Sequence, residues 1–313
     1  MRLAAIDLGT NTVRLLIVEA GAGPGWRALD QTQRVTRLGE GLAASGRLSE
    51  AAMTRTAETV TEYSARAARL GAGQVLIVGT SAVREGANGA AFAAALASAT
   101  GHPVRILSGL EEARLTLQGV LWGLAPLVGA VVVFDIGGGS TEFIRARDGA
   151  VEVAVSLRLG VVPLAEDRAT AAAVASSVRE RIRRELPPAI RGSGVDRLVG
   201  TAGTVTTLAA LDQGLTVYDP ARVHGYTLTQ GAVERQRARL APLSIAEIGQ
   251  LPCLEPGRAD LIGPGIAITL VVLDALGVES LVVSEYGLRE GIVAEALAPA
   301  APARRLDTPL PNA

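Results

Sequence analysis

An eight-residue string in the middle of the chain combines carboxylates, hydroxyls and glycines directly after an apolar run. It reads Asp-Ile-Gly-Gly-Gly-Ser-Thr-Glu from Asp135 to Glu142 and follows Val-Val-Val-Phe. Glycines let a backbone approach a ligand closely and turn its N–H groups toward phosphate oxygens. Carboxylates suit Mg²⁺, which proteins typically hold through one or two carboxylates plus phosphate and water. The string therefore predicts a site for phosphate, with Asp135 and Glu142 available to a metal; the alternative is a structural glycine-rich turn with incidental acids. Its candidate phosphate-binding residues are Gly137, Gly138, Gly139, Ser140 and Thr141.

A similar string lies near the N-terminus and reads Asp-Leu-Gly-Thr-Asn-Thr-Val-Arg over residues 7–14. Asp7 could hold a metal-bound water, and a polar hairpin turn is the alternative interpretation. Residues 75–81 and 197–203 form a second similar pair in the same order, which predicts two copies of one supersecondary plan. A cleft between two such halves is a common place for a ligand. The candidate phosphate-binding residues of the string at 7–14 are Asp7, Thr10, Asn11 and Arg14.

Two further strings place hydroxyls next to a turn. Ser81 and Arg84 follow an apolar run, and the planar fork of an arginine matches phosphate geometry. Gly203 and Thr204 lie where a turn enters a helix, whose N-terminus could accept a phosphate. The alternatives are a capped helix start with a surface ion pair for the first string and a tight strand-to-helix turn for the second.

Glu111 and Glu112 lie in the first turn of an expected helix, and one of them could act as a general base. Acids are favoured in a first turn by the helix dipole, so a purely structural role is the alternative. Adjacent helical residues point about 100° apart, so both cannot serve one role. The pattern by itself leaves the choice between them open.

Hydrophobic periodicity predicts an α/β protein in which strands carry these strings. The expected domains are 1–125 and 126–298, with the last helix able to pack on the first domain, and a disordered tail over 299–313. A Ser49 cap is expected for the helix to Leu70, and an Asn88 cap for the helix from about Ala90. The expected strands are 3–8, 13–19, 75–79, 103–107, 130–135, 142–147, 151–156 and 280–284, and the other expected helices are 110–123, 170–186, 229–240, 260–276 and 288–297.

Composition excludes several function classes. The 313 residues contain no lysine, which excludes a Walker A loop and Schiff-base chemistry. One cysteine excludes an internal disulfide, and two histidines leave a Cys/His zinc site short of ligands. A net charge of -1 argues against a broad nucleic-acid surface. We find no signal-type segment and no apolar run long enough for a membrane span, so a cytoplasmic protein is expected.

Taken together, the strings at 5–12, 79–84, 108–114 and 135–142 resemble those of the Ppx/GppA phosphatase family, the exopolyphosphatases and guanosine pentaphosphate phosphohydrolases. The strings at 200–204, 258–260 and 287–291 also look like family motifs. The resemblance covers roughly residues 3–297 in family order. It implies an α/β fold of two ribonuclease-H-like domains, as in actin-like ATPases, with an interdomain cleft.

The resemblance also implies Mg²⁺-dependent hydrolysis of a terminal phosphoanhydride, with Mn²⁺ as a possible substitute. By matching position, the catalytic glutamate is Glu112, the metal-binding acid is Asp135, and Glu142 helps to position metal or water. The implied substrate is inorganic polyphosphate, with pppGpp or a nucleoside triphosphate as the alternative, and a homodimer is the implied assembly.

Two departures from the family pattern bear on the substrate. Longer members carry further helical domains that help to hold long polyphosphate, and Pro163 stands where many members have arginine. We therefore expect short chains to be preferred. Functions from other classes are an ATP-binding kinase on the same fold, which would lack the 108–114 string, and a non-catalytic sensor of polyphosphate or alarmone.

Overall fold

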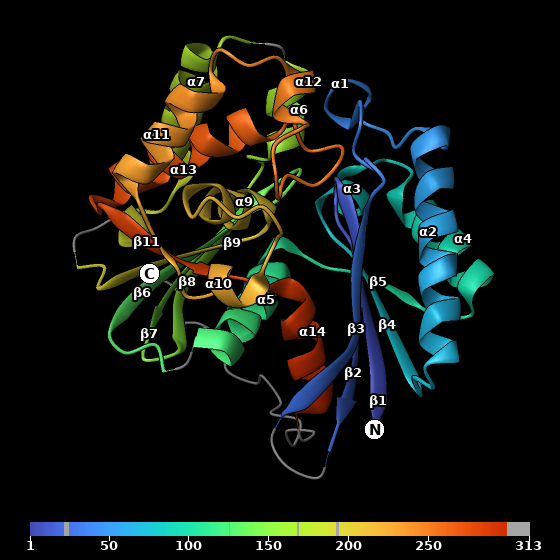
Figure 1. Cartoon of the computed structure of the whole chain (residues 1–313). Helices are drawn as coiled ribbons and strands as arrows, with labels where there is room; N and C mark the ends of the chain where they lie inside the picture. Colours follow the sequence, from blue (N-terminus) through green and yellow to red (C-terminus); the bar gives the residue numbers. More distant parts are fainter. Residues whose placement is uncertain (22–24, 125, 168, 192–193, 299–313) are drawn as a thin grey trace, which may run out of the picture.

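The computed structural model describes residues 1–21, 25–124, 126–167, 169–191 and 194–298. Two β-sheets, one from each half of the chain, lie on either side of a pair of packed helices (Figure 1). The first sheet has the strand order β3-β2-β1-β4-β5. Its strands are β1 (Arg2–Leu8), β2 (Thr12–Ala20), β3 (Trp26–Val35), β4 (Gln74–Gly79) and β5 (Val104–Ile106).

The second sheet repeats this plan with one strand added at the edge. Its order is β10-β11-β9-β6-β7-β8. Read from the β8 edge, the strands β8, β7, β6, β9 and β11 correspond to β3, β2, β1, β4 and β5 of the first sheet, and β10 is the added strand. In both sheets the opening hairpin is antiparallel and the next strand joins in parallel. The predicted α/β fold with two similar halves is confirmed. The strands are β6 (Ala130–Ile136), β7 (Thr141–Arg147), β8 (Ala150–Leu157), β9 (Arg197–Thr201), β10 (Thr227–Thr229) and β11 (Ser280–Ser284).

Helices cover the outer faces of both sheets and fill the space between them. The helices are α1 (Leu42–Ser45), α2 (Glu50–Arg69), α3 (Ser81–Glu85), α4 (Gly89–Thr100), α5 (Gly109–Leu124), α6 (Val161–Glu166), α7 (Ala171–Glu185), α8 (Pro188–Arg191), α9 (Gly203–Asp212), α10 (Pro220–Val223), α11 (Gln230–Leu240), α12 (Ile245–Ile248), α13 (Ile262–Leu276) and α14 (Leu288–Leu297). Within the described part of the chain, no helix combines the length and hydropathy needed to cross a membrane.

Alternation along the strands decides which layer each side chain joins. In β1, Ile6 packs in the cluster that includes side chains of α2 and α4, whereas Ala5 packs in the cluster that includes α14. In β6, Phe134 lies in the cluster with α7, α9 and α13, whereas Val133 lies in the cluster with α5. Both faces of each central strand are therefore buried, as continuous apolar runs predict.

The two inner helices, α5 and α14, contact one another through glycines. A Cβ on Gly119 would lie 1.8 Å from the carbonyl oxygen of Gly287, and one on Gly291 would lie 1.8 Å from that of Leu115. Although α5 comes from the first half of the chain, it packs on the second sheet, and α14 packs on the first. Each half thus contributes one helix that packs on the sheet of the other half. This middle layer holds the N-terminus of α5 between the sheets.

The structure departs from the sequence-based expectations in several elements. Strand β3 was not expected, because its exposed face and missing alternation give no clear strand pattern. Asn88 does not cap α4 with its side chain, which instead bonds the backbone N–H and carbonyl of Leu48. The buried helix begins at Ile262 rather than at residue 260. The predicted boundary residue 125 and the predicted tail 299–313 lie outside the described residues, so the domain limits stay a prediction.

Candidate active site

The turns of the two opening hairpins meet face to face. A Cβ on Gly138 would lie 2.9 Å from the Cβ of Thr10, and a Cβ on Gly139 would lie 2.4 Å from the Oγ of Ser81. Only glycine allows the β6–β7 turn to approach the β1–β2 turn and the start of α3 this closely. The glycines predicted to approach a ligand therefore also bring the two halves of the molecule together.

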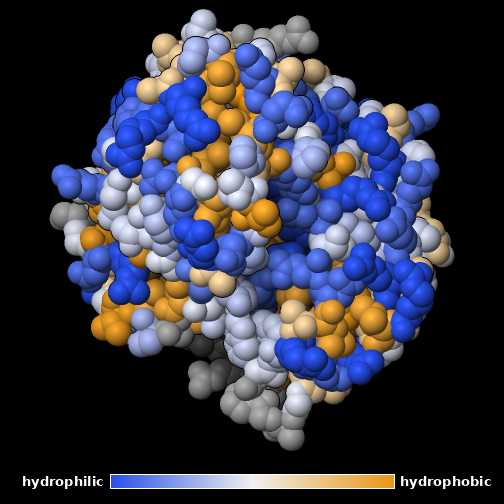
Figure 2. Space-filling model, viewed as in Figure 1, coloured by the Kyte–Doolittle hydropathy of each residue, from blue (hydrophilic) through white to orange (hydrophobic). Residues whose placement is uncertain are grey.

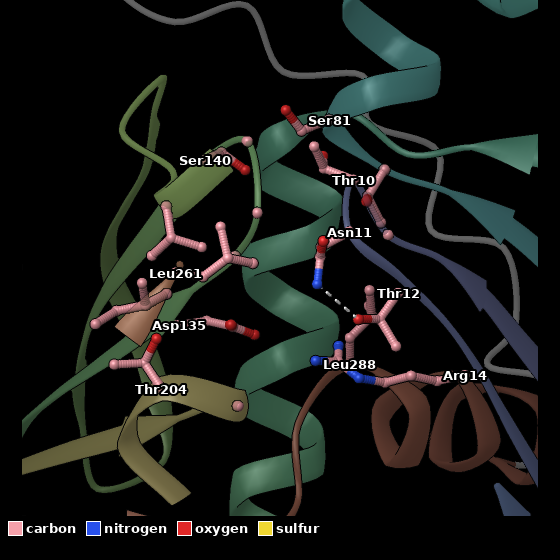
Figure 3. Close-up of a pocket in the computed structure, with 18 of the residues that line it drawn as sticks. Thr10, Asn11, Thr12, Arg14, Ser81, Asp135, Ser140, Thr204, Leu261 and Leu288 are labelled. Atoms are coloured by element: carbon pink, nitrogen blue, oxygen red, sulfur yellow. Dashed lines mark hydrogen bonds between the residues drawn. The ribbon is translucent and has the colours of Figure 1, made fainter. Parts of the chain in front are cut away.

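Beneath these turns lies a narrow cavity of about 80 Å³. In Figure 3, Thr10, Asn11 and Arg14 of the first half lie opposite Asp135, Ser140 and Thr204 of the second. The structure brings together most of the residues proposed from the sequence. Those that line the cavity are Asp7, Thr10, Asn11, Arg14, Ser81, Glu112, Asp135, Gly137, Gly138, Gly139, Ser140, Glu142, Gly203 and Thr204.

Two proposed phosphate ligands do not line this cavity. The hydroxyl of Thr141 is buried and donates to the carbonyl of Leu159, so it supports the loop rather than facing a ligand. Arg84 lies behind Glu112, and its Nη1 donates to the carbonyl of Leu107 at 2.8 Å. Thr141 is therefore not placed to bind phosphate, contrary to the sequence-based prediction. Arg84 contacts the candidate base Glu112 instead of lining the cavity.

The two adjacent glutamates of α5 have opposite environments. Glu111 accepts hydrogen bonds from Ser108 and pairs with Arg105 at 2.8 Å, and these contacts lower its pKa to about 2. Glu112 is only 8% exposed, and its Oε2 accepts from Arg84 Nη1 at 2.9 Å. Burial raises the pKa of Glu112 well above its usual range, and the nearby Glu142 raises it further. Of the two glutamates, Glu112 lines the cavity, whereas Glu111 caps the helix.

The carboxylates of Asp135 and Glu142 lie next to one another because the two residues are direct partners in the β6–β7 ladder. Side chains of such a pair project from the same face with Cβ atoms about 5 Å apart. Burial raises the pKa of Asp135 to about 6 and, with the charge of Asp135, that of Glu142 to about 7. Ser156 donates to Glu142 at 2.6 Å, and Thr116 donates to Asp135 at 3.4 Å.

The corresponding ladder pair of the first sheet is Asp7 and Arg14, whose carboxylate and guanidinium lie 3.4 Å apart. Burial raises the pKa of Asp7, and Arg14 opposes that shift. The Oδ1 of Asp7 and the Oδ1 of Asn11 are buried and have no hydrogen-bond partner among the residues that the structure describes. Since an unpaired buried acceptor is costly, these two oxygens are suited to a bound ligand or its hydration shell.

The donor set fits a hard divalent cation. Asp135 and Glu142 supply adjacent buried carboxylates, and Asp7 and Asn11 supply unpartnered oxygens. The described residues contain no group of three or more His, Cys, Asp or Glu side chains placed to enclose a metal. Such a partial set resembles the way Mg²⁺ is usually bound, with phosphate and water completing its shell.

Several residues of the site were not assigned by sequence reasoning. Arg258 donates to Thr12 at 3.2 Å from a loop of the other half, and Leu261 and Leu288 close the cavity. Ser156 and Thr116 hold the acidic pair from β8 and α5. The only sequence signal was the presence of Arg258 and Leu288 in strings that look like family motifs.

Comparison with known proteins identifies the family. The model of the Ppx/GppA phosphatase family matches residues 16–299. The chain belongs to this family. It is 36% identical to exopolyphosphatase 2 of Mycobacterium tuberculosis, over 93% of this chain and 97% of that protein. It is also 30% identical to a guanosine-5'-triphosphate,3'-diphosphate pyrophosphatase of Aeromonas hydrophila, over 93% of this chain and 58% of that protein.

Solved structures agree with this assignment. The Ppx/GppA family member of Aquifex aeolicus superimposes with a TM-score of 0.80 at 31% identity, covering 95% of this chain and 97% of that chain. Membership of the Ppx/GppA family confirms the predicted enzyme class, a phosphoanhydride hydrolase. It also confirms the predicted fold of two ribonuclease-H-like halves.

Proposed function

We propose that this Ppx/GppA protein is a Mg²⁺-dependent exopolyphosphatase that removes the terminal phosphate of short-chain inorganic polyphosphate. The observation that carries the proposal is the buried Glu112 facing a narrow cavity, which has glycine and hydroxyl loops on two sides and the Asp135–Glu142 pair beside it. The name of the mycobacterial relative, exopolyphosphatase 2, supports the same substrate.

The terminal phosphoryl group binds between the two hairpin turns. Backbone N–H groups and hydroxyls at Gly138–Ser140 and at Thr10 bind its oxygens, and Arg14 contributes positive charge. The N–H of Gly137, also proposed from the sequence, is not free for a ligand because it donates to the carbonyl of Ser140 at 2.9 Å. Preorganised donors of this kind stabilise the charge of a phosphoryl transition state at no cost in reorganisation. No covalent intermediate is needed for this hydrolysis.

Glu112 positions the attacking water and accepts its proton. Its raised pKa suits a general base, because such a group works best with a pKa near the working pH. Arg84 fixes the orientation of the carboxylate from the side away from the cavity. Mg²⁺ would be held by Asp135 and Glu142 and would supply positive charge to neutralise the phosphates, and Mn²⁺ is the expected substitute.

The second candidate is hydrolysis of the 5' γ-phosphate of pppGpp or of a nucleoside triphosphate. It is favoured by the 30% identity to the Aeromonas pyrophosphatase. The same loops and the same Glu112 would act on that bond, so the candidates differ only in what lies beyond the reacting phosphate.

The proposal is tested by phosphate release from tripolyphosphate, long-chain polyphosphate and pppGpp, each with Mg²⁺, with Mn²⁺ and with EDTA. We expect the highest kcat/KM for tripolyphosphate and no turnover in EDTA. A preference for pppGpp would establish the second candidate instead. Transfer of phosphate to an acceptor without its release would indicate a kinase, and binding without turnover at any Mg²⁺ concentration would indicate a sensor.

The assembly and location also stay predictions for this chain. A homodimer predicts a mass near 64 kDa, twice 32.1 kDa, by light scattering. A cytoplasmic location predicts recovery in the soluble fraction of its own cells.

A further inference from the structure

A second, wider cavity of about 430 Å³ adjoins the phosphate cavity. The two share Asp7, Arg14, Asp135, Arg258 and Leu288 in their walls, so a substrate that extends past these side chains enters the second cavity. In Figure 2 a hollow with a hydrophilic floor lies between the two halves of the molecule. A substrate that extends from the phosphate cavity into this hollow therefore contacts the walls of the second cavity.

The arginines of these walls are already paired with acids. Arg258 contacts Glu255 at 2.7 Å, and that carboxylate also accepts from Gln33 of the other half at 2.9 Å. Arg289 contacts Glu290 at 3.4 Å, as Arg14 does Asp7. The positive charge that a polyphosphate chain needs is therefore largely neutralised inside the second cavity.

The acids of the walls outnumber the arginines. Glu285 has no arginine within ion-pair distance among the described residues, and its carboxylate accepts a hydrogen bond from the hydroxyl of Tyr218. The charged residues lining the second cavity are Asp7, Asp135, Glu255, Glu285 and Glu290 against Arg14, Arg258 and Arg289. Asp7 and Asp135 also line the phosphate cavity, and Glu290 is buried and accepts from the backbone N–H of Gly287 at 2.8 Å. Glu255 and Glu285 are therefore the partly exposed acids of the second cavity.

We infer that Glu255 and Glu285 are specificity-determining residues that disfavour polyphosphate chains long enough to extend through the second cavity. The inference rests on the proposed function, because it takes the terminal phosphoryl group to lie between the two hairpin turns. Each added phosphate brings negative charge toward an acidic wall, and like charges at close range repel. The two residues thus act on binding of the chain and not on the bond that is cleaved.

The test is the double variant Glu255→Gln with Glu285→Gln, since glutamine keeps an oxygen for Gln33 and for Tyr218. We expect kcat/KM for long-chain polyphosphate to rise about 3- to 10-fold relative to tripolyphosphate, mainly through KM. The difference between variant and wild type shrinks as salt is added, because salt screens the charges. The matched control is Glu234→Gln on the surface of α11, which leaves the ratio unchanged.

An unchanged ratio in the double variant would overturn the inference, because the chain would then leave by another route. An equal loss on both substrates would overturn it too, since the acids would then be structural. If the double variant has a lowered Tm, Glu255→Gln alone is measured, and its ratio is read in the same way. Failure of the proposed function is distinguishable, because wild-type protein would then release no phosphate from tripolyphosphate.

Discussion

Replacement of Arg84 by glutamine is the perturbation whose effect on the site can be worked out in most detail. Arg84 Nη1 lies 2.9 Å from Glu112 Oε2, and both side chains are largely buried. At an effective dielectric constant of about 20, that separation corresponds to about 6 kcal/mol of attraction as an upper bound. Relaxation and entering water reduce it, and what remains of the attraction holds the pKa of Glu112 down, so removal of Arg84 raises that pKa further.

The sign of the effect on activity follows from the role of Glu112. A general base must be ionised, so kcat falls as the pH drops below its pKa. Arg84 opposes the raised pKa, and its removal therefore moves the acid limb of the kcat profile to higher pH. The assay is phosphate release at saturating tripolyphosphate and Mg²⁺ across the pH range, which separates this effect from changes in KM.

The matched control is Arg84→Lys, which keeps a positive charge and shifts the acid limb less than the glutamine variant. An acid limb that stays in place in Arg84→Gln, with kcat lowered equally at every pH, would refute the reasoning. Arg84 would then act on the phosphate itself, as proposed from the sequence, and not through Glu112.

Three further variants test separate parts of the site and the core. Gly139→Ala places a Cβ 2.4 Å from Ser81 Oγ, so we expect the loops to separate and kcat/KM to fall about 100-fold, measured by phosphate release at a temperature well below the Tm of the variant. Ser156→Ala removes the hydroxyl that holds Glu142, and the Mg²⁺ concentration for half-maximal activity rises about 10-fold, whereas an unchanged value would show that the hydroxyl is dispensable. Phe134→Ala empties a fully buried position in the second sheet, and urea denaturation will show a loss of about 3–5 kcal/mol in unfolding free energy.

Local patterns were sufficient to predict the residues of the loops. Three consecutive glycines after a buried strand, and the similar string around Asp7, gave both the loop chemistry and the repeated plan of the sheets. The interval from Asp7 to Arg14 equals that from Asp135 to Glu142, and the strand pairing gives this interval its meaning. Asp135 pairs with Glu142 across one hairpin just as Asp7 pairs with Arg14 across the other.

What could not be predicted depends on contacts between distant segments. In the sequence, Ser156 is an ordinary strand residue. In the fold, β8 lies beside the start of α5, so closely that a Cβ on Gly109 would be 2.4 Å from the Cβ of Ser156. Arg258 reaches Thr12 only because a loop of the second half closes over the first. The choice of Glu112 over Glu111 likewise needs tertiary burial, since both occupy the first turn of the same helix.

The central claim, that Glu112 is the general base of this cavity, is tested most directly by Glu112→Gln beside Glu111→Gln. Phosphate release from tripolyphosphate with Mg²⁺ is measured with Tm on the same preparations. The account predicts a loss of about 10²- to 10⁴-fold in kcat for Glu112→Gln with the protein still folded, and near wild-type turnover for Glu111→Gln. Full activity of folded Glu112→Gln would contradict it.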